Sequence, residues 1–477
     1  MTLSVCHVTS ELAPLAKSGG LADMVGALTA HLARAGHDVR VFLPRYGHMD
    51  LAGREVHPVE FLQDLELPLG GHRFPVSVAT TKIPGTDSFG LYLVDCPPLY
   101  HRRGLYDFAG DEHLRFALLG KAAIESCQRM AWGPRVFHLH DWHAGLVPLW
   151  LSALYGWDEL FAASRTLLTI HNLGYQGEFP AHVLDDLDLA PHAHRLPRED
   201  LDAGVVNFLK LGLLHADRLS TVSPTYAREI QTPEMGFGLD GLLSHRAGDL
   251  VGIVNGVDYG EWDPETDPRL PHHYSARALA GKERCKRALC ERVSLPYRKG
   301  LPVLGVVSRL VHQKGFHLVH EPLSEALGRG EAQLVALGTG EERYEATFRD
   351  LEHRFPDAAR FIPAYDEEAA HWIEAGADVF LMPSLYEPCG LNQMYSMRYG
   401  TLPVVRKTGG LADTVRPWDP DAGTGTGFVF EHTDVQGFRW ALGQALATYR
   451  DHPAGWRKLQ KNAMAEDFSW ERQGALY

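Results

Sequence analysis

Short apolar runs alternate with helical patterns in two separate series, and this alternation restricts the fold more than any other feature of the chain. The first series runs from Leu3–Val8 to Leu250–Val254, and the second from Pro302–Val307 to Gly427–Phe430. Residues 256–281, between the two series, are polar and rich in turn-forming residues. Because such alternation is typical of mainly parallel sheets with helices on both faces, we expect an α/β protein. Two doubly wound, Rossmann-like domains with a deep cleft between them are the simplest architecture.

The remaining strands and the clearest helices can be predicted from the same patterns. Further strands are expected at Asp38–Leu43, Phe74–Thr80, Phe89–Val94, Val136–Leu139, Thr166–Ile170, Arg218–Val222, Ala332–Leu337, Ala359–Ile362, Asp378–Leu381 and Leu402–Val405. Helices are expected at Leu21–Ala35, with Gly36 after its end, and at Leu114–Met130. We place the domain boundary at residue 255, so that residues 1–255 form the first domain and residues 256–455 the second.

Composition excludes several classes of protein. The chain has 477 residues, of which 45% are hydrophobic, so it can bury more than one core. The formal net charge of −14 argues against a nucleic-acid partner. The N-terminus shows no signal peptide, and no apolar run is long enough to span a membrane, so we expect a cytoplasmic protein. Six cysteines without C-x-x-C spacing predict neither a disulfide framework nor a structural zinc site.

One heptapeptide occurs twice, near the two ends of the chain. Lys17-Ser-Gly-Gly-Leu-Ala-Asp23 returns as Lys407-Thr-Gly-Gly-Leu-Ala-Asp413, and each copy follows an apolar run and precedes a helical pattern. Paired glycines at a strand-to-helix turn allow the backbone to approach a ligand closely, and the N–H groups that begin a helix attract anions. Shared ancestry and convergence both explain the repeat. The second copy lies close to another such turn, at Glu387 and Gly390, and together they suggest a diphosphate site.

Polar residues and glycines follow the predicted strands in both series. The residues concerned are Lys17, Asp141, His171, Arg309, Gly338, Glu387 and Gly409. Since the carboxyl ends of parallel strands meet at one edge of a sheet, ligands are expected there. Arg309 and Lys314 lie in one loop and can face a common anion, whereas the carboxylate of Glu387 suits hydroxyl groups better than phosphate.

Other candidates carry less specific signals. His138 and His140 would share one face of a strand, but Asp141 and His143 belong to the turn and the start of a helix. A tetrahedral metal site would therefore need ligands from elsewhere, and we expect none there. His171 is equally compatible with a structural and a catalytic role. Tyr365 is equally compatible with an adenine-stacking ring and an ordinary packed tyrosine.

Several motifs in this order resemble the bacterial glycogen synthase and plant starch synthase family over nearly the whole chain. They are Lys17–Asp23, His140–His143, Thr169–Asn172, Val222–Ile230, Asn255–Asp258, Ser308–Leu310, Gln313–Gly315, Glu387–Leu391 and Thr408–Asp413. The resemblance implies a retaining glycosyltransferase of the GT-B fold that moves glucose from ADP-glucose to the non-reducing end of an α-1,4-glucan such as glycogen. It implies no metal and no other cofactor, and a C-terminal helical segment, residues 456–477, that packs back on the first domain.

Site residues are also implied by the resemblance. The catalytic set is His171, Glu387, Asp141, Arg309 and Lys314. The donor-binding set comprises Arg309, Lys314, Lys17, Gly20, Asp23, Gly338, Tyr365, Cys389, Gly390, Leu391, Gly409 and Gly410. The acceptor-binding set is Tyr100, Asn172 and Asn255. No obvious carboxylate nucleophile is present, which favours departure of ADP from the face that the acceptor attacks.

The chain departs from the family pattern at three places. Tyr395 stands where the wider retaining GT-B class often has a second glutamate, and Asn392 stands where threonine is expected. The segment Leu99–Gly104 differs from the usual Leu-Tyr-Asp-Arg. Alternative functions are a glucan phosphorylase or another GT-B transferase, and a catalytically idle polysaccharide-binding protein. A dinucleotide oxidoreductase is disfavoured, since no G-x-G-x-x-G follows the first strand.

Overall fold

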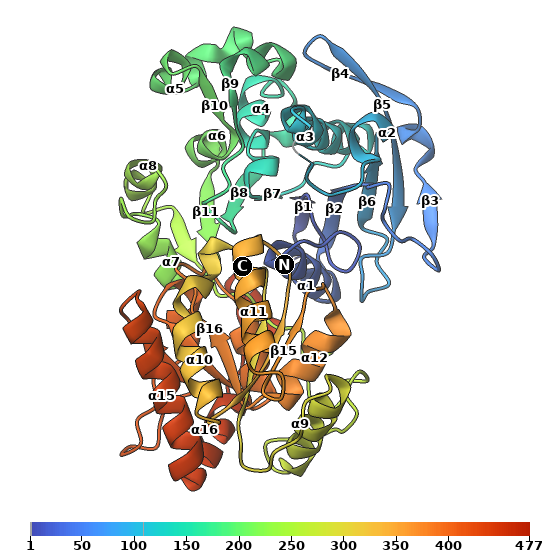
Figure 1. Cartoon of the computed structure of the whole chain (residues 1–477). Helices are drawn as coiled ribbons and strands as arrows, with labels where there is room; N and C mark the ends of the chain where they lie inside the picture. Colours follow the sequence, from blue (N-terminus) through green and yellow to red (C-terminus); the bar gives the residue numbers. More distant parts are fainter. Residues whose placement is uncertain (1, 108) are drawn as a thin grey trace. The chain divides into compact units, whose positions relative to one another are not determined.

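A computed structural model of the chain describes residues 2–107 and 109–477, which divide into two compact units. The first unit comprises the residues up to Val222 together with Ala227–Gly256 and Gly474–Tyr477. The second comprises Ser223–Tyr226 and Val257–Gln473. Each unit is built on its own sheet, and many of the elements of both are labelled in Figure 1.

Parallel strands form the centre of the first sheet. They are β1 (Ser4–Val8), β2 (Asp38–Pro44), β6 (Leu91–Asp95), β7 (Val136–His140), β8 (Arg165–Ile170), β11 (Arg218–Thr221) and β12 (Leu250–Gly252). Their spatial order is β12-β11-β8-β7-β1-β2-β6. Strand β1 pairs with β2 on one side and with β7 on the other, so the direction of winding reverses between β1 and β7. In doubly wound sheets this switch point is where ligands bind.

An antiparallel extension at one edge was not predicted. Strand β5 (His72–Thr81) pairs antiparallel with β6, and β3 (Val56–Pro58) and β4 (Leu65–Leu69) both pair antiparallel with β5. The expected strand Phe74–Thr80 therefore exists, but it belongs to a hairpin with β4 rather than to the parallel series. A second small antiparallel pair is formed by β9 (Glu178–Pro180) and β10 (Val205–Asn207).

All strands of the second sheet are parallel. They are β13 (Val303–Val307), β14 (Gln333–Leu337), β15 (Ala359–Ile362), β16 (Val379–Met382), β17 (Leu402–Arg406) and β18 (Phe428–Phe430). Their order is β15-β14-β13-β16-β17-β18, which is the 3-2-1-4-5-6 order of a Rossmann sheet. The switch point lies between β13 and β16, which pair directly. The α/β class and the mainly parallel sheets are therefore confirmed.

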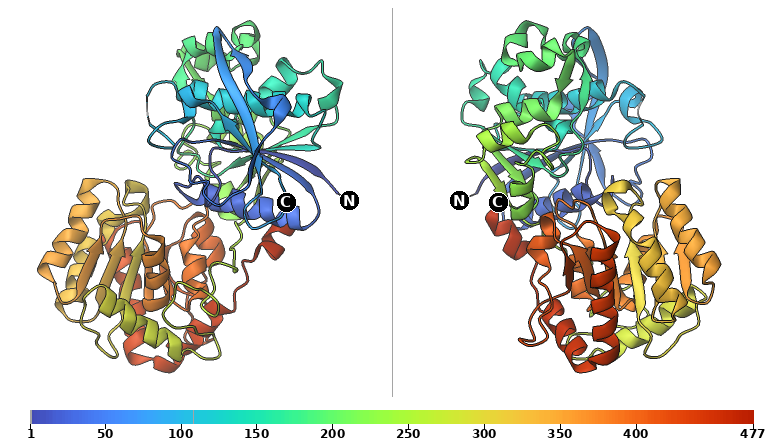
Figure 2. Two further views of the ribbon diagram at one scale, coloured as in Figure 1. Left: turned by 90° about the vertical axis from the view of Figure 1, so that its right-hand side faces the viewer. Right: turned by 60° about the vertical axis from the view of Figure 1, so that its left-hand side comes forward.

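Helices cover the sheets. Those of the first unit are α1 (Gly20–Arg34), α2 (Pro97–Tyr100), α3 (Glu112–Arg129), α4 (Val147–Ala153), α5 (Arg198–Asp202), α6 (Phe208–His215) and α8 (Asp240–His245), and α7 (Pro224–Glu229) has residues in both units. Those of the second are α9 (Ala280–Arg292), α10 (His320–Gly328), α11 (Glu342–Arg354), α12 (Glu367–Gly376), α13 (Asn392–Arg398), α14 (Gly409–Thr414), α15 (Val435–Asp451), α16 (Pro453–Met464) and α17 (Trp470–Gln473). Figure 2 shows helices on both faces of the second sheet.

Local sequence explains the first long helix. Leu21, Val25 and Leu28 recur at helical spacing and are buried. The helix stops before Gly36, whose φ of 87° lies in the left-handed region that glycine adopts without strain. The prediction that Gly36 follows the helix end is confirmed.

The C-terminal segment is divided between the two units. Helix α16 contacts α15, α13 and β17 of the second unit, because Leu459 and Ala463 bury their side chains there. Only Gly474–Tyr477 groups with the first unit, where this end of the chain contacts α1. The expected return of residues 456–477 to the first domain is therefore wrong for most of the segment and is limited to its last four residues.

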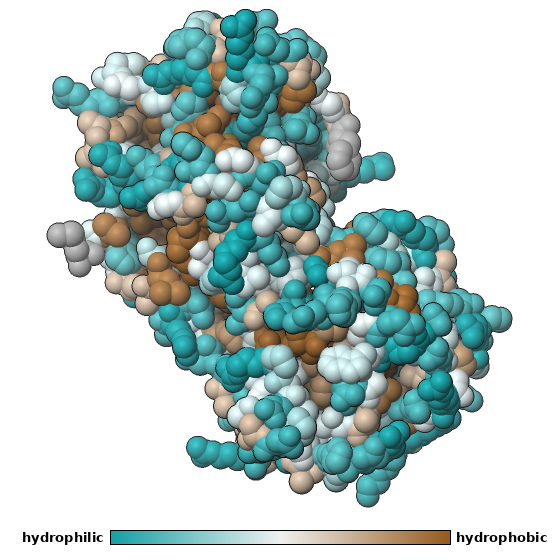
Figure 3. Space-filling model, turned by 90° about the vertical axis from the view of Figure 1, so that its left-hand side faces the viewer, coloured by the Kyte–Doolittle hydropathy of each residue, from teal (hydrophilic) through white to brown (hydrophobic). Residues whose placement is uncertain are grey.

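The surface, the lengths of the apolar helices and the state of the cysteines can be compared with what the composition predicts. On the face shown in Figure 3, hydrophobic residues form small patches between hydrophilic ones. Within residues 2–107 and 109–477, no helix is both long and apolar enough to cross a membrane. All six cysteines are buried and unbridged.

Candidate active site

Two basic residues and one carboxylate gather at the carboxyl edge of the second sheet. Arg309 follows β13, and its exposed side chain makes no hydrogen bond or ion pair with any residue that the structure describes. Lys314 lies further along the same loop, in a short 3₁₀ helix, and Glu387 follows β16. Since β13 and β16 are the switch-point strands, the expected convergence of these residues is what the topology produces.

Lys314 and Glu387 form a close ion pair. The Nζ atom of Lys314 donates to both carboxylate oxygens of Glu387, at 2.9 and 2.6 Å. Ser384 Oγ donates to the same carboxylate at 2.9 Å. The side chain of Glu387 is only 7% exposed, so its charge depends on these partners. Lys314 therefore has a partner before any anion binds, which the sequence did not indicate.

The two glycine turns of the second unit pack directly against each other. The N–H of Gly410 lies 3.1 Å from the carbonyl oxygen of Glu387, and a Cβ atom on Gly409 would lie 1.9 Å from that oxygen. Gly409 and Gly390 have φ values of 42° and 72°. Only glycine fits such close backbone contacts without strain, so the two turns that lie close together in sequence are also in contact.

The other donor-binding candidates of the second unit line the same edge. Gly338 directly follows β14, and a Cβ atom on it would lie 1.9 Å from the carbonyl oxygen of Ser308. Cys389 is buried, and Leu391 directly precedes α13. Asn392, the departure from threonine, donates from its amide to the carbonyl oxygen of Val307 at 2.7 Å and so ties α13 to β13.

Tyr365 exposes 73% of its surface, so it is not an ordinary packed tyrosine. That exposure is compatible with a stacking ring, and adenine stacking stays a prediction.

In the first unit, the first copy of the heptapeptide forms the turn that leads into α1. Lys17 Nζ lies 2.7 Å from Asp23 Oδ1, and Gly20 begins the helix. The buried carboxylate of Glu11, which the sequence did not single out, accepts hydrogen bonds from Ser18 N at 2.6 Å, from Ser18 Oγ at 2.6 Å and from Tyr106 Oη at 2.7 Å. This carboxylate fixes the shape of the turn.

Asp141 and His171 lie together at the carboxyl ends of β7 and β8. Asp141 Oδ1 accepts hydrogen bonds from the backbone N–H groups of His171 at 2.7 Å and Asn172 at 3.4 Å. Burial raises the pKa of Asp141 to about 7, and these backbone hydrogen bonds act in the opposite direction. The Oδ1 atom of Asn172 accepts from Gly174 N at 3.0 Å. These contacts fix the loop that carries His171.

The histidines near β7 separate into two groups. His138, His140 and His171 lie with His7 of β1 in one buried cluster, and His7 was missed by the sequence analysis. His143 instead packs on Trp142, with ring centroids 4.1 Å apart. His7, His138 and His140 place nitrogen atoms within 4.8 Å of one another, so the geometry admits a metal ion there. The expectation that no metal binds stays a prediction.

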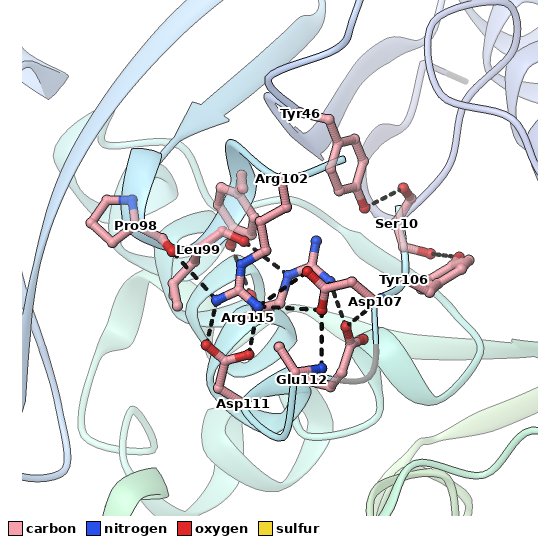
Figure 4. A network of polar contacts seen from close by, with 12 residues as sticks. Ser10, Tyr46, Pro98, Leu99, Arg102, Tyr106, Asp107, Asp111, Glu112 and Arg115 are labelled. Atoms are coloured by element: carbon pink, nitrogen blue, oxygen red, sulfur yellow. Dashed lines mark hydrogen bonds and ion pairs between the residues drawn. The ribbon is translucent and has the colours of Figure 1, made fainter. Parts of the chain in front are cut away.

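One acceptor-binding candidate is wrong. The ring of Tyr100 is fully buried, and its hydroxyl donates to the carbonyl oxygen of Arg115 at 2.8 Å, so it cannot meet a glucan. Figure 4 shows the polar network into which the neighbouring residues are tied. Arg102 donates to Asp111 Oδ1 at 2.8 Å, and Arg115 Nε donates to the carbonyl oxygen of Leu99 at 2.9 Å.

Asn255 is also buried, and its Oδ1 atom has no hydrogen-bond partner among the described residues. Its acceptor-binding role stays a prediction, as does that of Asn172.

Comparison with known proteins decides the family. Residues 4–245 match the starch synthase catalytic domain family, and residues 291–462 match the family of glycosyl transferases group 1. A glycogen synthase of Thioalkalivibrio sulfidiphilus is 46% identical over the whole chain and 98% of its own length. A glycogen synthase of Streptococcus sanguinis is 41% identical over 100% of this chain and 98% of its own. The chain belongs to the glycogen synthase and starch synthase family.

Solved structures agree with this assignment. The catalytic domain of starch synthase IV from Arabidopsis thaliana, bound to ADP and acarbose, is 34% identical and matches with a TM-score of 0.93 over 100% of this chain and 98% of that one. Sucrose-phosphate synthase from Thermosynechococcus elongatus is 18% identical, covers 99% of this chain and 96% of its own, and has a TM-score of 0.61, which supports the fold alone. This member of the glycogen synthase family is thus a GT-B glycosyltransferase, as expected.

The buried histidines predict that this glycogen synthase family member loses stability in mild acid. Burial lowers the pKa of His138 and of His171 to about 3, and it lowers the pKa of His7, His140 and His143 well below the usual range. Below the unfolded-state pKa of about 6.5, the unfolded chain therefore binds more protons than the folded chain, and the free energy of unfolding falls. His138 and His171 together cost about 4 kcal/mol between pH 7 and pH 5.

Asp141 acts in the opposite direction. Because its pKa is raised, the folded chain binds a proton on Asp141 between pH 7 and pH 5, whereas the unfolded chain releases that proton above about pH 4. This proton uptake raises the free energy of unfolding by about 2 kcal/mol between pH 7 and pH 5 and so offsets part of the loss caused by the histidines. We therefore expect the free energy of unfolding, measured with urea, to be at least about 2 kcal/mol lower at pH 5 than at pH 7. Equal values at the two pH values would contradict the burial of neutral histidines.

Proposed function

We propose that the chain transfers glucose from ADP-glucose to the non-reducing end of an α-1,4-glucan, with retention of the anomeric configuration. The relatives named above are glycogen synthases, and the similar starch synthase structure holds ADP and acarbose. The single observation that carries the proposal is the Lys314–Glu387 pair at the switch point of the second sheet. Arg309 lies in the same loop as Lys314, and its side chain has no partner among the described residues. One place thus offers cations for a diphosphate and a carboxylate for sugar hydroxyls.

The second unit supplies the charge that stabilises the leaving group. Arg309 provides a planar fork of N–H donors, and Lys314 provides a compact ammonium charge. As the bond between the glucose C1 atom and the diphosphate oxygen breaks, negative charge grows on the diphosphate, and both cations stabilise it. Glu387, held by Lys314 and Ser384, accepts hydrogen bonds from glucose hydroxyls. Gly409 and Gly410 would face the distal phosphate.

The first unit acts on the sugar. His171 would lie beside the reacting glucose, Asp141 and Asp23 would bind hydroxyl groups, and Lys17 would contact the donor phosphate. In this site the Asp141 carboxyl already accepts two backbone hydrogen bonds, which favours an orienting role over attack on C1. We infer that the acceptor hydroxyl oxygen bonds to C1 on the face that ADP leaves, while its proton passes to the departing diphosphate oxygen. Bond making and bond breaking then balance without an enzyme nucleophile.

No metal and no further cofactor enters this scheme, because Arg309 and Lys314 supply the positive charge that a divalent cation supplies in many phosphate-transfer enzymes. We therefore propose that transfer is unaffected by a chelator of divalent cations.

A donor panel on glycogen tests the function. Purified protein is incubated with glycogen and radiolabelled ADP-glucose, UDP-glucose or glucose 1-phosphate, with and without the chelator, and label in the polymer is counted. We expect ADP-glucose to give the fastest incorporation. Preference for glucose 1-phosphate would support a phosphorylase instead, and binding of glycogen without incorporation from any donor would support an idle polysaccharide-binding protein.

Replacing Arg309 by alanine should separate binding from stability. Because the guanidinium is exposed and makes no hydrogen bond or ion pair with the residues that the structure describes, the free energy of unfolding should change by less than about 0.5 kcal/mol. Loss of its contact with the diphosphate should lower kcat/KM at least about 100-fold and abolish most of the thermal stabilisation by ADP. The measurements are thermal melts with and without ADP, and initial rates.

Arg277 provides the matched control. It is also exposed and in the second unit, but it precedes α9 rather than following a strand. Arg277→Ala should keep both the rate and the ADP-induced shift. If Arg309→Ala behaves like Arg277→Ala, Arg309 does not hold the diphosphate.

A further inference from the structure

Three buried histidines form a continuous chain of hydrogen bonds at the switch point of the first sheet. His7 Nδ1 lies 3.1 Å from His140 Nε2, and His140 Nδ1 lies 3.1 Å from His171 Nε2. His7 and His140 have no exposed surface, whereas His171 keeps 8% of its surface exposed. His171 is therefore the only member of the chain that a ligand can reach.

Strand register produces this arrangement. His7 of β1 pairs with His138 of β7, and His140 lies two residues further along β7 on the same face. His140 pairs with Thr169 of β8, and His171 follows two residues later. Three neighbouring strands thus deliver rings to one side of the sheet, where the ring planes of His7 and His140 are inclined by only 8°. His138 lies beside these three hydrogen-bonded histidines, but its ring bonds to Thr169 Oγ1 at 2.7 Å instead.

Counting protons leaves two possible arrangements. Burial keeps all three rings neutral, so each carries one N–H and one lone pair. If His7 and His171 both donated to His140, that ring would have no proton, and if His140 donated to both, it would be a buried cation. The protons therefore lie either on all three Nδ1 atoms or on all three Nε2 atoms.

The His7 end of the row of hydrogen-bonded histidines decides between the two proton arrangements. His7 Nε2 is buried and has no hydrogen-bond partner among the residues that the structure describes. With protons on Nε2, this atom would be a buried N–H donor without an acceptor, which native structures rarely tolerate. With protons on Nδ1, it is only an unused lone pair. His7 then donates to His140, and His140 donates to His171.

We propose that His140, oriented by His7, is a positioning residue that holds the proton of His171 on Nδ1, so that His171 meets a sugar hydroxyl as a hydrogen-bond donor. The Nδ1 atom of His171 has no hydrogen-bond partner within residues 2–107 and 109–477 and is left for the ligand. The backbone of His171 is fixed separately by Asp141, at 2.7 Å. The inference rests on the proposed function for the identity of the ligand, but the proton position belongs to the free protein.

This arrangement assigns a definite chemistry to His171. A neutral ring whose Nε2 lone pair already accepts from His140 cannot also take a proton there from an acceptor hydroxyl. His171 thus orients the sugar rather than acting as a general base. The same hydrogen bonds use both ring nitrogens of His140, which is one of the three histidines whose geometry admits a metal ion.

Nuclear magnetic resonance of the ring nitrogens tests the proton position without substrate. The full chain is labelled with ¹⁵N-histidine, and the His171 signals are identified by their loss in His171→Asn. Protonated and unprotonated ring nitrogens resonate far apart, so the tautomer is read directly. We expect a protonated Nδ1 and a bare Nε2 at pH 7. A proton on Nε2 of His171 in the unsubstituted protein overturns the proposal.

Three substitutions at position 140 whose new side chains are similar in size to one another test how the proton position affects catalysis. The side-chain nitrogen of His140→Asn can occupy the place of Nδ1 and still donate to His171, so kcat should remain within about 3-fold. His140→Leu removes the donor, and kcat should fall at least about 10-fold with a smaller change in KM. His140→Asp offers an acceptor, should draw the His171 proton to Nε2, and should lower kcat furthest. Equal kcat values in all three variants would overturn the proposal.

His138→Leu is the matched control for packing. His138 is also buried on the same strand face, but it bonds to Thr169 rather than to His171. It should lose stability as His140→Leu does and keep the Nδ1 proton and the kcat of the folded protein. An equal loss of kcat in both leucine variants would show that His140 has only a structural role. Absence of transfer by the unsubstituted protein, with the expected tautomer present, would refute the proposed function and leave the proton assignment standing.

Discussion

Replacing Lys314 by alanine is expected to lower kcat about 1,000-fold, more than any other single substitution in the second unit. The ammonium group has two tasks in the proposed mechanism: it neutralises charge on the departing diphosphate, and it holds the carboxylate of Glu387 at 2.6 Å. Its loss removes a contact that strengthens in the transition state and frees the residue that binds the glucose hydroxyls. Rates on glycogen with saturating ADP-glucose measure the effect.

Lys286 supplies the control for breaking a buried ion pair. Its Nζ atom lies 2.8 Å from Asp378 Oδ2, and both side chains are buried. Asp378 precedes β16, at the amino end of the strand, whereas Glu387 follows its carboxyl end. Lys286→Ala should cost about 3–5 kcal/mol of stability because it leaves the buried Asp378 carboxylate without its cation, with the Val303 N–H still donating to it at 2.8 Å. The kcat of its folded fraction should stay close to that of the unsubstituted protein. A similar kcat loss in both variants would argue that Lys314 acts only through stability.

The strands of the second unit could be predicted closely because the central ones, β13, β14, β16 and β17, are buried on both faces. Such strands appear in a sequence as short continuous apolar runs bounded by polar residues. The run Ala359–Ile362 is reproduced without change, and Leu402–Val405 is extended by one residue in β17. The convergence of Arg309, Lys314 and Glu387 followed from the rule that ligands bind at the carboxyl edge, which requires no knowledge of side-chain contacts.

What the sequence did not reveal depends on contacts between distant residues. The role of His7 is set by the pairing of β1 with β7, which a linear pattern does not specify. Lys314 and Glu387 are 73 residues apart, and each looked like a separate ligand contact. The motif suggested that Tyr100 binds the acceptor glucan. Its ring is instead buried in the core, where its hydroxyl donates to the carbonyl oxygen of Arg115. The antiparallel hairpin of β4 and β5 was missed because the pattern of apolar residues does not show whether neighbouring strands run parallel or antiparallel.

Replacing Gly409 by alanine is expected to be the most damaging small substitution in the second unit. Its φ of 42° lies in the left-handed region, and the new Cβ atom would lie 1.9 Å from the carbonyl oxygen of Glu387. Backbone strain and the steric clash together should lower the free energy of unfolding by about 3 kcal/mol. Because that oxygen belongs to the backbone, the turn that carries Glu387 must move. A displacement of about 1 Å at a reacting group can cost about 100-fold in rate, so kcat should fall as well.

Gly443→Ala separates this effect from the general consequence of adding a methyl group. Gly443 is exposed in the interior of helix α15, and a Cβ atom on it would meet nothing within 4 Å. Alanine favours a helix over glycine by about 1 kcal/mol, so this variant should unfold at a higher urea concentration with kcat unchanged. The two substitutions are chemically identical, and their opposite signs would follow from backbone geometry alone. If Gly409→Ala is instead as stable and as active as the unsubstituted protein, the two glycine turns are not in contact, and Glu387 is not held in place by the second heptapeptide.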